Sequence, residues 1–175
     1  MTYPNDVFFD IETLVNVSQA QRILLLGNCR PGFLDNYIQQ KALLNQNCEL
    51  THINSADIES LWKLNQRFDV AIVIDLFEHI EKNKGMQVLS RLRDVLSPQY
   101  CICLPLSSAA NGDSWHLTDL FSFALSRVSN YQIEVDGKTK ELGLFKYNIN
   151  DYKKTPDWLN ADNWANPQMW GKYWW

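Results

Sequence analysis

Three continuous apolar runs constrain this chain of 175 residues more than any other feature of its sequence. They are RILLLG at residues 22–27, FDVAIVID at residues 68–75 and YCICLPL at residues 100–106. Short apolar runs that do not alternate with polar residues are typical of strands that are covered on both faces of a parallel sheet. The sequence therefore predicts an α/β domain built around these three strands, with the strand at residues 22–26 in a central position.

Segments with a helical spacing of apolar residues lie before, between and after these strands. Apolar residues recur at spacings of three and four in segments 6–18, 33–42, 88–96 and 117–128. We expect Asp6 to cap the first helix and Pro98 to stop the third. The third helix aligns the apolar residues Val88, Leu89, Leu92, Val95 and Leu96. The fourth aligns Leu117, Leu120, Phe121, Ala124, Leu125 and Val128.

Further β structure is predicted on both sides of these helices. Residues 48–54 are β-like, and residues 55–67 are expected to form a loop with one helical turn. Alternating stretches around residues 131–135 and 145–149 flank the turn signal Asp-Gly-Lys. The expected fold is therefore an α/β sandwich whose mostly parallel sheet ends in an antiparallel hairpin.

Composition limits the partners and the location that we expect. A net charge of −4 gives no general attraction to nucleic acid or to anionic membranes, so neither is an expected partner. No apolar run approaches the roughly eighteen residues that span a bilayer. The acidic N-terminus lacks the basic region of a signal peptide, so we expect a cytoplasmic protein. No metal site is expected, because metal-ligand spacing is missing among Cys29, Cys48, Cys101, Cys103, His52, His79 and His116.

The C-terminal segment departs from the α/β pattern. Residues 151–175 hold five of the seven tryptophans, namely Trp158, Trp164, Trp170, Trp174 and Trp175. Each indole has a large apolar area to bury, so we expect these rings to be covered by protein. We therefore divide the chain into a domain at residues 1–150 and an arm at residues 151–175. The arm is a clamp over the sheet edge, a lid over the site or a homo-oligomer contact, and the sequence leaves these alternatives open.

One segment carries a resemblance to a known family. Residues 68–80, FDVAIVIDLFEHI, place an acidic residue after a buried strand and then open a helix with Leu-Phe-Glu-His-Ile. This arrangement resembles the fourth-strand motif of class I S-adenosylmethionine-dependent methyltransferases. Residues 88–106 resemble the next helix and strand of that family, and residues 23–34 take the first-strand position. The resemblance covers roughly residues 20–150 and implies a Rossmann-like methyltransferase sandwich.

The resemblance also implies a site for S-adenosylmethionine beyond the carboxyl ends of the strands. Backbone N–H groups after the first strand would bind the cofactor carboxylate, and the guanidinium of Arg30 would reinforce them. The residues implied in cofactor binding are Gly27, Asn28, Arg30, Gly32, Asn54, Asp57, Asp75, Leu76 and Phe77. Those implied on the substrate side are Glu78, His79, Trp115 and His116. Replacing Gly27 by Val is expected to weaken binding while leaving the fold largely intact.

The chain departs from the family pattern in two places. Residues 26–32, LGNCRPG, lack the family's acidic residue and its two middle glycines. Between Gly27 and residue 68 one strand–helix unit of about 20 to 30 residues is missing, which shortens the central region. Asn54 stands where the family has a ribose-binding acid, with Asp57 as a substitute. Two functions stay open: a methyltransferase for an unknown acceptor, or a fold that has lost catalysis and serves as a binding or protein-interaction module.

Overall fold

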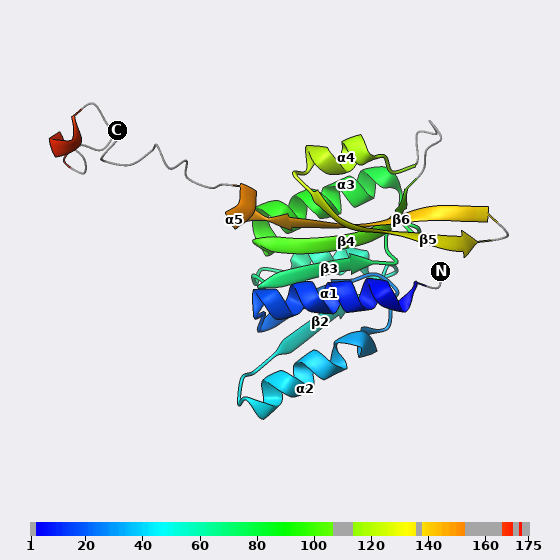
Figure 1. The fold of residues 1–175 in the computed structure, drawn as a ribbon, viewed down its shortest axis with the longest axis horizontal. Coiled ribbons are helices and arrows are strands. Elements are labelled where there is room, and N and C mark those ends of the chain that lie inside the picture. Colours follow the sequence, from blue (N-terminus) through cyan, green and yellow to red (C-terminus); the bar gives the residue numbers. More distant parts are fainter. Residues whose placement is uncertain (1–2, 107–113, 136–137, 153–165, 170–171, 173–175) are drawn as a thin grey trace.

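One six-stranded sheet organises the chain (Figure 1). The structure is a computed structural model that describes residues 3–106, 114–135, 138–152, 166–169 and 172. The strands are β1 (Arg22–Leu26), β2 (Glu49–Ile53), β3 (Val70–Ile74), β4 (Gln99–Leu106), β5 (Ser126–Val135) and β6 (Lys138–Asn148). The α-helices are α1 (Asn5–Ser18), α2 (Asp35–Leu43), α3 (Lys82–Arg91), α4 (Leu117–Ser122) and α5 (Ile149–Tyr152). Shorter helical turns are the 3₁₀ turns η1 (Pro31–Leu34), η2 (Ile58–Lys63) and η5 (Pro167–Met169), and the π-helical turn η3 (Leu92–Leu96).

The sheet has the strand order β2-β1-β3-β4-β6-β5. The first four of these strands pair in parallel, whereas β6 is antiparallel to both β4 and β5. This arrangement confirms the predicted fold class, a mostly parallel Rossmann-like sheet that ends in an antiparallel hairpin. Among the described residues, β2 alone lies beyond β1, as expected for a shortened central region. β1 was predicted to be central, and it does have a neighbouring strand on each side. The two middle strands of the sheet, however, are β3 and β4.

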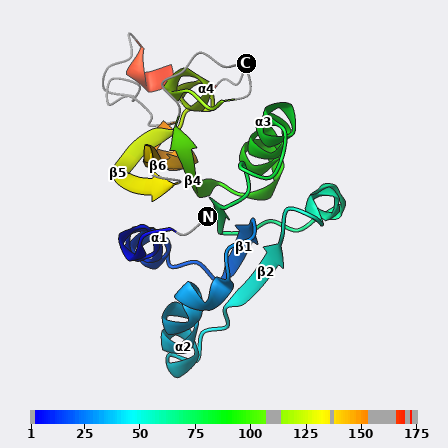
Figure 2. The ribbon, with the colours of Figure 1, turned by 90° about the vertical axis from the view of Figure 1, so that its right-hand side faces the viewer.

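Helices cover both faces of the sheet (Figure 2). On one face, Val7, Ile11 and Val15 of α1 pack with Tyr37 of α2 on the alternate side chains of β1, β3 and β4. On the other face, α3, η2 and α4 cover the remaining side chains of the same strands. Each central strand is thus buried on both sides, which explains why these strands read as unbroken apolar runs. Cys101 and Cys103 are buried on the α1 face, as small apolar residues would be.

The predicted helix at residues 117–128 is wrong in its second half. Helix α4 ends at Ser122, and Ala124 then adopts a left-handed backbone with a φ of 58°. Strand β5 begins at Ser126 and contains an irregularity between Arg127 and Ser129. The extra residue of this bulge is Val128, which lies three and four residues after Leu125 and Ala124 and so imitates a helical spacing. Val128, which was expected on the helix stripe, is exposed on the strand.

Two smaller expectations about helices are also corrected. The N-cap of α1 is Pro4 and makes no side-chain cap hydrogen bond, while Asp6 lies in the first turn, where a carboxylate favours the helix dipole. Val95 was expected on the buried stripe of the third helix, yet it is 40% exposed. The N–H of Ser97 donates to the carbonyl of Leu92, five residues earlier. This wider π turn rotates the helix surface, so Leu96 stays in the core and Val95 faces outward.

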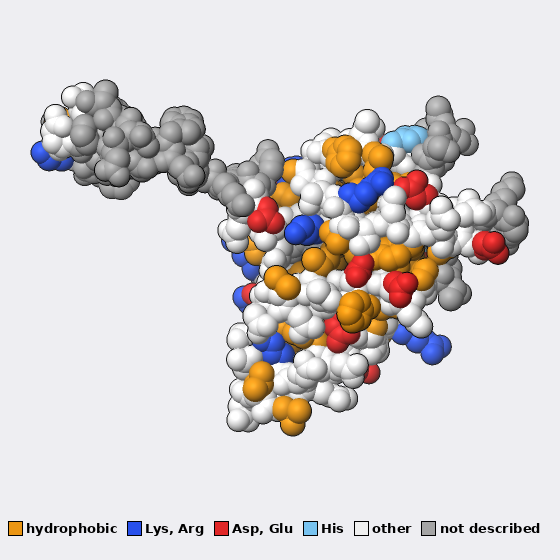
Figure 3. Space-filling view, in the orientation of Figure 1, with side chains coloured by type: hydrophobic (Ala, Val, Ile, Leu, Met, Phe, Trp, Pro, Cys, Tyr) orange, Lys and Arg blue, Asp and Glu red, His pale blue; other side chains and the backbone are white. Residues whose placement is uncertain are grey.

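Apolar side chains also reach the surface on the face that carries α1 (Figure 3). Phe9 and Val17 of α1 are exposed, as are Leu43 and Leu44 at the end of α2. Within the described part of the chain, no helix combines the length and the hydropathy needed to span a bilayer. The five tryptophans of the predicted C-terminal arm lie outside the described residues.

Candidate functional site

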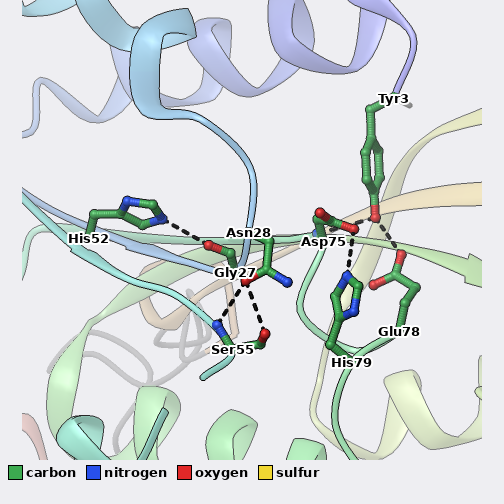
Figure 4. Close-up of polar contacts among 8 residues, drawn as sticks. All are labelled: Tyr3, Gly27, Asn28, His52, Ser55, Asp75, Glu78 and His79. Atoms are coloured by element: carbon green, nitrogen blue, oxygen red, sulfur yellow. Dashed lines mark hydrogen bonds and ion pairs between the residues drawn. The ribbon is translucent and has the colours of Figure 1, made fainter. Parts of the chain in front are cut away.

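Three loops meet at the carboxyl edge of the parallel strands (Figure 4). They follow β1, β2 and β3. The N–H of Gly27, after β1, donates to the carbonyl of Ile53 in β2 at 2.9 Å, and the N–H of Asn28 donates to the carbonyl of Asp75 after β3 at 3.1 Å. From β1 the chain steps to β2 on one side and then to β3 on the other, so the strand order reverses here. Ligands of open α/β sheets bind at such a reversal.

Gly27 permits the close approach of the first loop to β3. Its φ is +118°, and a Cβ atom at this position would lie 1.9 Å from the carbonyl oxygen of Ile74. Both the dihedral angle and the lack of space require glycine. The expectation that Gly27→Val would leave the fold largely intact is therefore wrong, because the backbones of β1 and β3 would have to separate.

Polar side chains join the first two loops. The side-chain oxygen of Asn28 accepts hydrogen bonds from the N–H and the hydroxyl of Ser55, at 3.1 and 3.0 Å. A ring nitrogen of His52 lies 2.8 Å from the carbonyl oxygen of Gly27. The Asn54 side chain accepts the N–H of Asp57 at 2.9 Å and shapes the turn after β2. Asn28 and Asn54 thus use their side-chain oxygens to hold loop geometry.

Asp75 ends β3 in a strained conformation. It has a left-handed backbone with a φ of 56°, which is uncommon outside glycine, and it is 8% exposed. One oxygen of its carboxylate lies 3.2 Å from Nε2 of His79, and its N–H donates to the hydroxyl of Tyr3. Strained residues of this kind cluster at functional sites. The strain and the enclosed carboxylate make Asp75 the centre of the candidate site.

Tyr3 connects the N-terminal segment to this centre. Its hydroxyl accepts the N–H of Asp75 and donates to the carboxylate of Glu78. Burial, reinforced by the charge of Glu78, raises the pKa of the Tyr3 phenol far above its usual range, so it acts here as a neutral donor. Glu78 as a whole is exposed, but desolvation of its carboxyl raises its pKa, and the hydrogen bond from Tyr3 opposes this shift.

Several polar groups at this edge remain available to a ligand. Within the described residues, no hydrogen bond or ion pair involves the guanidinium of Arg30, the carboxylate of Asp57, or the backbone N–H groups of Cys29 and Arg30. Arg30 and Asp57 are exposed. Burial, with the negative charge of Asp75, raises the pKa of the half-buried Cys29 thiol to about 11. The loops thus offer a cation and N–H donors on one side, and an anionic acceptor on the other.

Some residues implied by the family resemblance are buried or make structural contacts. Leu76 and Phe77 are buried in the cluster beneath the loops. Trp115, expected on the substrate side, is 5% exposed, and its ring centroid lies 4.8 Å from that of Phe77. His116 is the N-cap of α4, where its N–H donates to the carboxylate of Asp119 at 2.9 Å. The structure therefore gives Trp115 and His116 structural contacts, and their place on the substrate side stays a prediction.

Sequence patterns did not single out three members of this site, Tyr3, His52 and Ser55, although Ser55 lies in the segment 54–57 that was expected to border it. Tyr3 is separated from Asp75 by 72 residues, and no local motif relates the two. His52 and Ser55 flank the predicted ligand position at Asn54, so their place at the strand end was a usable signal. Within the described residues, no group of three or more His, Cys, Asp or Glu side chains is placed to hold a metal ion.

Comparison with known proteins identifies the family of the chain. Residues 5–175 match the family of unknown function DUF6231, and the chain belongs to this family. No curated protein matches its sequence.

Solved structures of low sequence identity are similar to the chain. Magnesium protoporphyrin IX methyltransferase (ChlM) from Synechocystis PCC 6803 with bound SAH is 10% identical, with a TM-score of 0.48 over 81% of this chain and 82% of that chain. The O-methyltransferase TomG from Streptomyces achromogenes in complex with SAM is 11% identical, with a TM-score of 0.47 over 84% and 82%. The 1,6-didemethyltoxoflavin-N1-methyltransferase of Burkholderia thailandensis is 14% identical, with a TM-score of 0.48 over 81% and 78%.

Proposed function

We propose that this member of the DUF6231 family binds S-adenosylmethionine at the carboxyl edge of β1, β2 and β3 and transfers its methyl group to an acceptor. The observation that carries the proposal is the junction of Gly27 and Asn28 with Asp75 at the reversal of strand order. The methyltransferase-like motif at residues 68–80 contains Asp75 of this junction, which adds independent support from the sequence.

The groups left available at this edge match the polar parts of the cofactor. The guanidinium of Arg30 and the N–H groups of Cys29 and Arg30 would bind the carboxylate of its methionine portion. The carboxylate of Asp57 would accept hydrogen bonds from the ribose hydroxyls. Pro31 contributes no N–H, so the guanidinium of Arg30 carries more of the anion binding than it would in a glycine-rich loop.

Bound S-adenosylmethionine supplies a methyl group on a positively charged sulfur. The residues of this chain would mainly align an acceptor with that methyl group, because positioning accounts for a large part of the barrier reduction in reactions of this type. The enclosed carboxylate of Asp75 would favour a positive charge nearby. Glu78 and His79 stand beside it, where either could take a proton from an acceptor.

Ligand-dependent thermal stability tests the proposal on the full chain. A ligand at 100 times its dissociation constant adds about 2.7 kcal/mol to the free energy of unfolding. S-adenosylmethionine and S-adenosylhomocysteine should therefore both raise the melting temperature, and adenosine at the same concentration should raise it less, because it lacks the methionine carboxylate. If neither cofactor form changes the melting temperature at millimolar concentration, the proposal fails. The fold would then serve a binding role without methyl transfer, which is the alternative that the sequence left open.

A further inference from the structure

Strand β2 forms an open edge of the sheet. It is the last strand on its side of the sheet, with α2 beside it (Figures 1 and 2). Within the described part of the chain, β1 is the one strand that pairs with β2. Of the five residues of β2, only Ile53 is buried. An unpaired strand edge of this kind is a template to which another strand can add.

The backbone of β2 presents two of its residues outward. The N–H of Glu49 and the carbonyl of Ile53 form hydrogen bonds toward β1 and its flanking residues, at 2.7 and 2.9 Å. Because this direction alternates along a strand, the N–H and C=O groups of Leu50 and His52 point away from β1. Among the described residues, no hydrogen bond involves these outward groups. They are therefore available to a further strand.

The opposite edge of the sheet is protected against such pairing. Strand β5 has an irregularity between Arg127 and Ser129, and Arg127 and Glu134 place charges along it. Bulges and charged side chains are common means of preventing association between strand edges. Strand β2 pairs with β1 without an irregularity and contains no proline and no basic residue, and its one acid, Glu49, stands at its start. Of the two edges, β2 is the one that fits another strand.

The outward groups of β2 match those of a second copy of β2. In an antiparallel pair about a twofold axis, Leu50 of each copy would exchange both backbone hydrogen bonds with His52 of the other, and Thr51 would face its own copy. Each outward donor and acceptor would thereby find a partner. In this register Glu49 would face Ile53, so no charged side chain of β2 would meet its own copy. The edge is thus its own complement.

Helix α2 supplies the further area that such a pair needs. A strand of five residues is only about 17 Å long, whereas each partner of a stable interface buries about 800 Å². Leu43 at the end of α2 is 84% exposed, and Leu44 directly after it is 67% exposed. Every exposed side chain of residues 36–47 is uncharged, and the one charged residue in this range, Lys41, is buried. Two copies of this surface can therefore meet without like-charge repulsion.

We propose that two copies of this chain associate through β2, in an antiparallel pair centred on Thr51. The twofold axis is then perpendicular to the sheet, so both α2 helices lie on the same face of one continuous sheet. Leu43 and Leu44 of each copy flank the joint between the two sheets and lose their exposure to water. The pairing does not rest on the proposed methyl transfer.

Sedimentation velocity of the full chain tests the inference. The wild type should change from a monomer of 20.4 kDa to a dimer as its concentration rises through the micromolar range. Leu50→Pro removes the outward N–H and keeps the bonds to β1, so it should raise the dissociation constant of the dimer by about 10- to 100-fold. Leu50→Ala is the matched control, because it shortens the same side chain and keeps the N–H. It should weaken the dimer much less than Leu50→Pro.

A second variant tests the helix surface at a position that the fold does not need. The side chain of Leu43 is exposed, so Leu43→Glu should fold normally and raise the dissociation constant about tenfold or more. Val17→Glu is its control, because Val17 is 80% exposed on α1 and should leave the dimer unchanged.

A cysteine at the twofold axis tests the register. Facing residues of a non-hydrogen-bonded antiparallel pair have Cα atoms about 4.5 Å apart, within the range of a disulfide. Thr51→Cys should therefore give a covalent dimer on oxidation, and mass spectrometry should find two peptides linked through position 51. Glu134→Cys on β5 should give no such dimer.

Three outcomes overturn the inference. A wild-type chain that stays a monomer at millimolar concentration does not pair through β2. A dimer that Leu50→Pro and Leu50→Ala weaken equally does not use the outward N–H of β2. A dimer that persists in Leu43→Glu, and that Thr51→Cys does not link, is held by another surface of the chain. These measurements involve no cofactor, so their failure is distinguishable from failure of the proposed function.

Discussion

The backbone N–H of Asn28 donates to the carbonyl oxygen of Asp75 at 3.1 Å, which joins the loop after β1 to the loop after β3. This bond uses one N–H donor of a loop that already lacks another at Pro31. The donors of Cys29 and Arg30 therefore become more important for any anionic ligand. The same Asp75 has a left-handed φ of 56°, so the loop after β1 contacts the chain at the point where the backbone leaves β3.

Alanine at position 27 should destabilise the fold. The substituted residue would have to adopt a φ of +118° and place its Cβ against the carbonyl oxygen of Ile74. Backbone strain alone costs on the order of 1–3 kcal/mol, and the clash adds to it. Urea unfolding of Gly27→Ala should show this loss. Gly32→Ala is the matched control in the same loop, since its Cβ would meet only the Asp35 carboxylate, at 3.6 Å. Equal unfolding midpoints for the two variants would contradict the close approach at Gly27.

Glycine should be better tolerated than alanine at position 75. Both substitutions remove the carboxylate that contacts His79, but alanine must also bear the left-handed φ of 56°. That conformation costs a residue with a Cβ roughly 1–2 kcal/mol. We expect Asp75→Gly to unfold at a higher urea concentration than Asp75→Ala. The order should reverse at Asp94 in the helical turn η3, where glycine is about 1 kcal/mol worse than alanine. If glycine is better tolerated than alanine at both positions, backbone strain at Asp75 does not explain the difference between the two variants.

The central strands were predictable because burial on both faces leaves an unmistakable pattern. Residues 22–26 match β1 at both ends, and β3 lies within residues 68–75. The predictions of secondary structure and burial are wrong where the backbone departs from regular helix or strand geometry. The bulge between Arg127 and Ser129 disguised the start of β5 as helix, and the π turn at η3 turned Val95 to the surface. An analysis of apolar spacing cannot detect the bulge or the π turn, because each adds one residue to the regular repeat of its strand or helix.

The candidate site was predictable only as far as strand ends determine it. Strand order places Gly27, Asn54 and Asp75 at one edge, and the sequence located all three strands. It could not reveal Tyr3, whose hydroxyl reaches Asp75 only because α1 packs across the sheet. Nor could it show that Trp115 packs on Phe77, since an aromatic residue in a polar segment is equally consistent with a binding surface. Both contacts depend on tertiary packing.

Cys29 should react slowly with alkylating reagents despite its place in an exposed loop. The thiolate is the reactive form, and a pKa of about 11 leaves roughly one molecule in a thousand ionised at about pH 8. An ordinary thiol with a pKa of about 8.5 would be ionised in roughly one molecule in four. The raised pKa predicts that the iodoacetamide rate, followed by mass spectrometry of the Cys29 peptide, still rises about tenfold per pH unit near pH 9–10. Glutathione in the same reaction should level off earlier. A plateau for Cys29 at the pH where glutathione levels off would show that burial and Asp75 do not perturb this thiol.

Asp57 should determine cofactor affinity without contributing to the fold. Its carboxylate is exposed and makes no hydrogen bond or ion pair among the described residues, while its N–H keeps the bond to Asn54 in any variant. A hydrogen bond to a charged group contributes about 1.5–3 kcal/mol, so Asp57→Asn should weaken S-adenosylhomocysteine binding about 10- to 100-fold in calorimetric titrations. The urea unfolding midpoint should stay within error of the wild type. Glu134→Gln removes an exposed charge from β5 and should change neither quantity. If Asp57→Asn binds as tightly as Glu134→Gln, the ribose hydroxyls lie elsewhere, and the assignment of the β2 loop to the site is wrong.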